Sequence, residues 1–126
     1  MKGHRDLIAW RKAMRLVTDI YRVTRTFPRE ETYGLTAQVR RAAISVPSNL
    51  AEGHGRTSRK EFHQFIAHAR GSLVEVETQL EIALNLGHLA KDAAASLLDQ
   101  ASEVGRLING LMLWAESDAD SLTPDS

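Results

Sequence analysis

Apolar residues recur at spacings of three and four along almost the whole chain, and this spacing limits the fold more than any other feature of the sequence. One face of an α-helix has this period, whereas a half-buried strand alternates at every second residue. No stretch of the chain shows that alternation, and the longest helical run extends from Phe62 to Leu84. The sequence therefore predicts an all-α protein.

Helix-breaking residues divide these runs into four predicted helices. Pro28 ends the first, because the residue before a proline avoids the α region, and glycines at positions 53 and 87 follow the second and third. Ser58 and Glu61 form a capping box at the start of the third helix. The predicted helices span residues 6–27, 34–53, 58–86 and 91–116, with Asp6 and Asp92 as caps of the first and fourth.

Four amphipathic helices with short connections predict an antiparallel, up-down-up-down four-helix bundle over residues 1–116. Gly71 falls inside the third helix, where glycine costs about 1 kcal/mol relative to alanine. We therefore expect another backbone to pack closely against it. Residues 117–126 are polar, acidic and aperiodic, and they predict a disordered tail. The length of 126 residues fits one domain.

Composition excludes several kinds of site. The chain has no cysteine, which rules out disulfides, zinc–thiolate sites, iron–sulfur clusters and cysteine nucleophiles. No apolar run approaches the roughly 20 residues of a membrane span. No apolar signal-peptide core follows the N-terminus, because basic residues interrupt it. We expect a cytoplasmic protein that makes no membrane contact.

The sequence also lacks the common catalytic and metal-binding patterns. Four-helix bundles often hold di-iron sites, but no glutamate here is followed three residues later by histidine. His63 and His68 are five residues apart, not the four of a helical metal pair. The segment GHGRTS at residues 53–58 lacks the lysine of a P-loop; an ordinary inter-helix turn is favoured there over an anion site. We predict no enzyme activity, no metal and no cofactor.

Charge is divided unequally along the chain, although its net value is zero. Residues 1–60 contain 13 Lys and Arg against 5 Asp and Glu, a net charge of +8. Residues 61–126 contain 3 against 11, a net charge of −8. This division indicates either an anionic partner for the first half or packing of one half against the other, within or between subunits. Segregated solvated faces are a third interpretation.

Arginines of the first predicted helix form a narrow row. At 100° per residue, Arg11, Arg15, Arg22 and Arg25 fall within about 80° and extend over about 20 Å. Arginine pairs well with phosphate, so this row predicts a surface that follows a nucleic-acid backbone. The candidate nucleic-acid-binding residues are Arg11, Arg15, Arg22, Arg25, Arg40, Arg56, Arg59 and Lys60.

Two other interpretations of the row stay open. Asp19 lies one turn from Arg15 and Arg22 and can pair with one of them, but it cannot neutralise four arginines. The arginines can also pair across a subunit boundary. In that case the chain is a structural assembly or protein-adaptor module that makes no nucleic-acid contact. The acidic residues that could pair with the arginines of a neighbouring subunit are Glu75, Glu81, Asp99 and Glu103.

The segment from Arg40 to Gly53, RRAAISVPSNLAEG, resembles the four-helix-bundle family of ribosomal RNA intervening-sequence proteins. This family takes its name from reading frames inside insertions in bacterial large-subunit ribosomal RNA genes. The resemblance covers most of the chain up to Ala115. Further matching motifs occur in order along the chain: Asp6-Leu7 with Trp10, Phe27-Pro28, Tyr33-Gly34-Leu35, Glu61-Phe62, Gly71-Ser72 and Gln79-Leu80.

The resemblance implies a bundle that assembles as a ring-like homopentamer. A related branch, the accessory protein of diversity-generating retroelements, binds nucleic acid and a reverse transcriptase through a basic surface. The partners that follow by analogy are copies of the chain itself, RNA or another nucleic acid, and a protein partner. We also expect a structural hydrogen-bonded network, within the bundle or at a subunit contact, among Arg41, Asn49, Glu52, Ser72 and Glu75.

Overall fold

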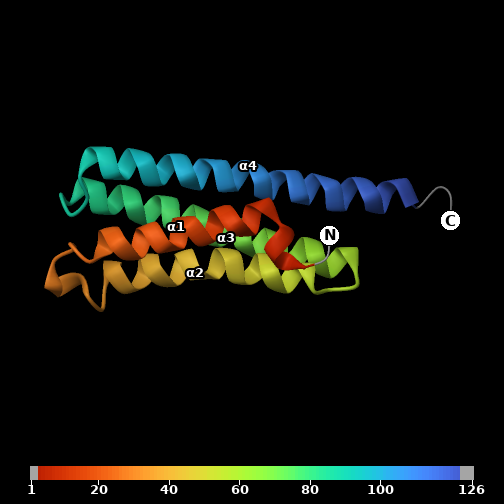
Figure 1. Cartoon of the computed structure of the whole chain (residues 1–126), viewed down its shortest axis with the longest axis horizontal. Helices are drawn as coiled ribbons and strands as arrows, with labels where there is room; N and C mark the ends of the chain where they lie inside the picture. Colours follow the sequence, from red (N-terminus) through yellow and green to blue (C-terminus); the bar gives the residue numbers. More distant parts are fainter. Residues whose placement is uncertain (1–2, 123–126) are drawn as a thin grey trace.

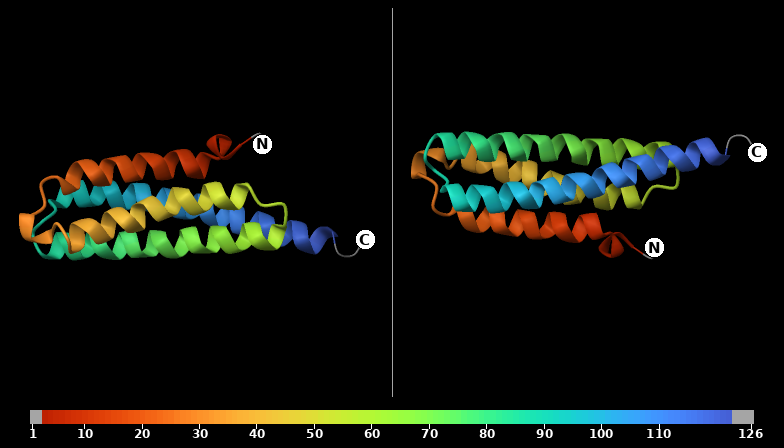
Figure 2. Two further views of the ribbon diagram at one scale, coloured as in Figure 1. Left: turned by 90° about the horizontal axis from the view of Figure 1, so that it is seen from below. Right: turned by 90° about the horizontal axis from the view of Figure 1, so that it is seen from above.

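A computed structural model describes residues 3–122 and shows four long helices that run antiparallel in chain order (Figure 1). Each helix packs against its two neighbours: α1 and α3 both contact α2 and α4. Figure 2 shows α1 and α3 on opposite sides of the bundle. The predicted four-helix bundle is therefore confirmed. The helices are α1 (Ile8–Thr24), α2 (Leu35–His54), α3 (Arg59–Asn85) and α4 (Lys91–Leu122), and two short 3₁₀ helices are η1 (His4–Asp6) and η2 (Arg29–Glu31).

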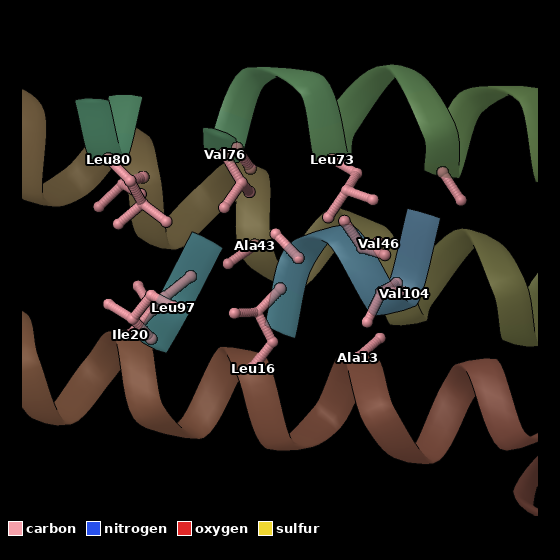
Figure 3. Packing of buried hydrophobic residues seen from close by; sticks show 14 of the residues in the cluster. Ala13, Leu16, Ile20, Ala43, Val46, Leu73, Val76, Leu80, Leu97 and Val104 are labelled. Carbon is pink, nitrogen blue, oxygen red and sulfur yellow. The ribbon is translucent and has the colours of Figure 1, made fainter. Parts of the chain in front are cut away.

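The core forms because each helix turns one apolar face toward the common axis. Side chains from all four helices meet there in successive layers (Figure 3), and the largest of them are fully buried. Alanines alternate with larger residues across the layers, which lets the helices approach closely. Residues drawn from the four helices in Figure 3 include Ala13, Leu16, Ile20, Ala43, Val46, Leu73, Val76, Leu80, Leu97 and Val104.

One carboxylate links the two loops at the end of the bundle opposite the α2–α3 turn. Glu31 Oε1 accepts a hydrogen bond of 3.1 Å from the backbone N–H of Leu35, in the first turn of α2. Glu31 Oε2 lies 3.1 Å from Nε2 of His88, in the α3–α4 loop. The hydrogen bond from Leu35, and to a smaller extent the one with His88, lowers the pKa of the Glu31 carboxyl below its ordinary value. The carboxylate therefore stays ionised at neutral pH and joins both loops.

The helix ends agree with the sequence in part. Ser58 caps α3 as predicted, since its Oγ accepts a hydrogen bond of 3.1 Å from the Glu61 N–H. Asp6 lies in η1, and the residue before α1 is Leu7. Asp92 lies inside the first turn of α4, which begins at Lys91. α4 continues to Leu122, so residues 117–122 differ from the predicted tail; residues 123–126 lie outside the described residues.

The close approach expected at Gly71 occurs at Gly53 instead. Gly71 is exposed, and a methyl group added there would meet no atom within 4 Å. At Gly53, by contrast, an added Cβ would lie 3.0 Å from Cβ of Phe65 and 3.3 Å from Cδ1 of Ile66. Helix α3 thus packs tightly against α2 near the end of α2. The prediction for Gly71 was wrong because propensity alone does not tell which face of a helix is covered.

Candidate nucleic-acid interface

The arginine row lies on the outer face of α1. The buried residues of this helix, among them Ala13, Leu16 and Ile20, are centred about 180° around the helix from Arg11. All four arginines of the row are exposed and leave the helix on the side opposite the core. The residues that form this face, called the α1 arginine face below, are Arg11, Arg15, Arg22 and Arg25.

Local pairing accounts for only one of these charges. Arg22 Nη1 donates a hydrogen bond of 3.1 Å to Oδ1 of Asp19, whose Oδ2 accepts another from Gln100 in α4. Arg11 Nη1 donates to the backbone carbonyl of Arg5 at 3.1 Å, which leaves its charge unbalanced. Among the described side chains, those of residues 3–5 and 7–117, neither Arg15 nor Arg25 forms an ion pair. The α1 arginine face therefore keeps most of its positive charge.

The acidic residue Glu103, a candidate for pairing between subunits, already has a partner within the chain. Its carboxylate lies 3.2 Å from Nζ of Lys12 and joins α4 to α1. Lys12 lies beside the row and not in it, as the angular arithmetic predicts. Glu103 is therefore paired within the chain, which makes it a weaker candidate for pairing with an arginine of another subunit.

Arg40 holds two helices together and does not join the α1 arginine face. Its Nε donates a hydrogen bond of 2.8 Å to Oγ1 of the buried Thr24, and its Nη2 donates to the Tyr21 carbonyl at 3.3 Å. Its guanidinium also lies 4.4 Å from the centre of the Tyr21 ring. Because two of its nitrogens are directed at α1, Arg40 joins α1 to α2, a role that the sequence-based assignment to nucleic-acid binding did not include. We leave it out of the interface.

The other predicted cations gather at the α2–α3 turn. The guanidinium of Arg56 lies 4.7 Å from the ring centre of Phe65, and its Nη2 lies 3.4 Å from Glu52. The guanidinium of Arg59 lies 4.4 Å from the ring centre of Trp114 in α4. Lys60 is exposed beside them. The predicted basic residues thus form two groups, one along α1 and one at an end of the bundle.

The expected polar network is smaller than predicted and is centred on a residue that the sequence analysis missed. Ser45 and Ser72 share a hydrogen bond of 2.7 Å between α2 and α3. Asn49 Nδ2 donates to both the carbonyl and the hydroxyl of Ser45. The spacing of four between Ser45 and Asn49 was the available signal. Arg41 and Glu75 line the same α2–α3 groove but are exposed, and Glu52 pairs with Arg56 instead.

An uncharged strip covers the outer face of α3. Within about 40° of the direction opposite the core, residues 67–85 include no charged side chain. Val74 is 55% exposed and Ile82 is 43% exposed, which is unusual for aliphatic residues on the side of a helix that faces solvent. The strip, called the α3 strip below, consists of Ala67, Gly71, Val74, Thr78, Ile82 and Asn85.

Other kinds of site are not evident in the described part of the chain. Among the side chains that the structure describes, at residues 3–5 and 7–117, no three histidines, aspartates or glutamates come close enough together to hold a metal ion. Within the same range, no helix has the length and apolar character needed to cross a membrane.

Comparisons with known proteins agree with this fold. The sequence profile of the 23S rRNA-intervening sequence protein family matches residues 5–110. A crystal structure of a protein of unknown function from the S23 ribosomal protein family of Bacteroides thetaiotaomicron is similar, with a TM-score of 0.77 and 17% sequence identity. The similarity covers 83% of this chain and 95% of that chain, and at this identity it shows the fold alone. No curated protein matches the chain.

Proposed function

Because the chain belongs to the family of 23S rRNA-intervening sequence proteins, we propose that it is a non-enzymatic helical bundle that binds RNA or another nucleic acid through the α1 arginine face. The proposal rests on the exposure of four guanidinium groups opposite the core. Among the side chains described at residues 3–5 and 7–117, only Arg22 of the four pairs with a carboxylate. A row of cations on a rigid helix suits a regular array of phosphates.

The dimensions of the face fit this partner. The row extends about 20 Å along the helix, which corresponds to about six phosphates at 3.4 Å per nucleotide along one strand. Arginine presents a planar fork of donors that matches phosphate oxygens, and it remains charged at every physiological pH. Phosphate contacts carry no base information, and these arginines are exposed on one helix face that would follow the backbone. We therefore expect binding that depends little on the nucleotide sequence.

Replacing Arg11, Arg15 and Arg22 together by alanine is expected to weaken nucleic-acid binding by at least about tenfold at low salt. Each lost phosphate contact should also reduce the slope of log affinity against log salt by about 0.7–0.9. Fluorescence anisotropy with a labelled RNA, at salt concentrations from about 50 to 200 mM, measures both quantities. The loss should be uniform across RNA sequences.

The matched control replaces Arg70, Lys91 and Arg106, three exposed cations of α3 and α4, by alanine. It changes net charge by the same amount but leaves the α1 arginine face intact, so we expect a much smaller loss of affinity. Equal losses in the two triple variants, or no binding by the unmodified protein at low salt, would contradict the proposal. If the α1 variant instead lowers the particle mass in light scattering, the arginines serve the alternative function of subunit pairing.

We also propose that the chain assembles with copies of itself, in the ring-like homopentamer that the family resemblance implies, through the α3 strip. Exposed aliphatic residues along an uncharged strip are typical of a surface that another protein covers. Because α1 and α3 lie on opposite sides of the bundle (Figure 2), assembly through α3 leaves the arginines of α1 accessible. In a ring, the strip of one copy contacts a different face of the next copy, and the rotation from copy to copy closes on itself.

Replacing Val74 by glutamate should lower the particle mass in light scattering toward the 14.0 kDa of a single chain. The charge would have to be buried in the contact, which costs far more than placing it at an exposed site. The control is Leu113→Glu on α4, where the side chain is 66% exposed and outside the α3 strip. A monomeric unmodified protein, or an unchanged mass of the Val74 variant, would exclude assembly through this strip.

A further inference from the structure

A pocket of about 620 Å³ lies where the α2–α3 turn meets the C-terminal part of α4. The end of α2 contributes His54, the turn and the start of α3 contribute Arg56, Arg59 and Phe62, and α4 contributes Trp114. Figure 1 shows the turn and this part of α4 at the same end of the bundle. Pockets that hold small organic groups commonly have volumes of about 300–1,000 Å³, so the space is sufficient for one.

The apolar wall of the pocket is aromatic. Trp114 and Phe62 meet edge to face, with ring centres 5.6 Å apart and planes at 82°. Trp114 is nevertheless 50% exposed, so a large part of its ring remains in contact with water. An indole ring exposed in a concave site is a surface on which another planar group can stack.

The rim of the pocket is cationic. The guanidinium of Arg59 lies 4.4 Å from the ring centre of Trp114. Arg56 lines the same pocket from the turn, and its Nη2 lies 3.4 Å from Glu52, an exposed i,i+4 pair of the kind that adds little stability. No acidic residue lines the pocket in the described part of the chain. Thr57 and Ser58 add hydroxyl groups to its lining. The site therefore combines an aromatic wall for a planar ring with the exposed guanidinium of Arg56 for an anion near that ring.

We propose that this pocket holds an unpaired base of a single-stranded nucleic acid, with its phosphate at the cationic rim. The base stacks on the Trp114–Arg59 pair, and Arg56 binds the neighbouring phosphate. Stacking on aromatic rings and guanidinium planes is how proteins recognise unpaired bases, whereas a duplex keeps its bases inside the helix. The inference rests on the proposed nucleic-acid binding and adds a preference for single strands.

An acidic peptide is a less suitable occupant. Its carboxylates could pair with the arginines at the rim of the pocket. They would leave the Trp114 and Phe62 rings exposed, because carboxylate side chains have no aromatic ring to stack there. A nucleotide supplies both parts, a flat base and an adjacent phosphate. The pocket also lies toward the end of the bundle at which α1 begins (Figure 1).

The test uses the fluorescence of Trp114 in the full-length chain. The protein has two tryptophans, so a Trp10→Phe background leaves Trp114 as the sole indole. The probes are a labelled oligouridine of about 12 nucleotides, an RNA duplex of the same length, and free UMP. Anisotropy of the label reports total binding, and quenching of Trp114 reports stacking in the pocket.

We expect the single strand to quench Trp114 and the duplex to bind with little quenching. Trp114→Leu should weaken oligouridine binding by about tenfold or more while leaving duplex affinity unchanged. The quenching measurement uses the intact pocket, so it stands even if the leucine variant folds poorly. Oligouridine binding without quenching and without an effect of Trp114→Leu would overturn the pocket assignment alone.

Failure of the proposed function gives a different result. If neither the strand nor the duplex changes anisotropy at low salt, nucleic-acid binding itself is wrong, and the pocket assignment falls with it. If UMP quenches Trp114 while no oligonucleotide binds, the single-strand assignment is overturned in favour of a mononucleotide site.

Discussion

Replacing Ile66 by alanine is expected to lower the free energy of unfolding by about 2–5 kcal/mol. Ile66 is fully buried, and its Cδ1 lies close to Gly53 where α2 and α3 approach each other. The change removes buried methyl groups and leaves a cavity that helices held by neighbours on both sides cannot fully close. A domain of this size has a total stability of about 5–15 kcal/mol, so the loss is a large part of the whole. Urea unfolding followed by circular dichroism measures it.

Ile82→Ala is the matched control, with the same change of side chain in the same helix. Ile82 is 43% exposed on the α3 strip, so at low protein concentration the loss should stay below about 1 kcal/mol. Comparable losses at the two positions would mean that α3 does not turn the face containing Ile66 toward the core. A loss at Ile82 that grows with protein concentration would agree with assembly through the strip.

Arg40→Ala is expected to lower the free energy of unfolding by about 1.5–3 kcal/mol, the usual cost of losing hydrogen bonds from a charged donor. The side chain bonds to Thr24 and to the Tyr21 carbonyl and packs on the Tyr21 ring, so one truncation removes three contacts between α1 and α2. Arg40→Lys should recover only part of the loss, because an ammonium group cannot reproduce the planar fork. Thermal and urea unfolding report the change.

The neighbouring Arg41 is the control for Arg40. It carries the same charge but is exposed, and Arg41→Ala should change stability by no more than about 0.5 kcal/mol. If Arg40→Ala leaves stability intact and instead weakens nucleic-acid binding, the sequence-based assignment of Arg40 is right and the structural one is wrong. The pair thus separates the two roles at adjacent positions.

The arginines show which features could be predicted from the sequence and which could not. Helical periodicity placed Arg11, Arg15, Arg22 and Arg25 on one face, because residues within one helix have fixed relative directions. Arg40 could not be assigned in this way, since its role depends on Thr24 and Tyr21 in another helix. The same limit applies to Gly53 and Gly71: both are helical glycines, and only the position of α3 relative to α2 shows which of them is crowded.

The sequence by itself determined the number of helices, the apolar face of each one and the arginine row on the first, because all three follow from the helical period along a single element. Only the tertiary structure decided which charges are held by partners on other helices, that Ser45 meets Ser72, and where Trp114 meets Arg59 and Phe62. Those contacts bring together residues from different helices or distant turns. Their distances are fixed by how the core packs, which periodicity within one helix does not encode.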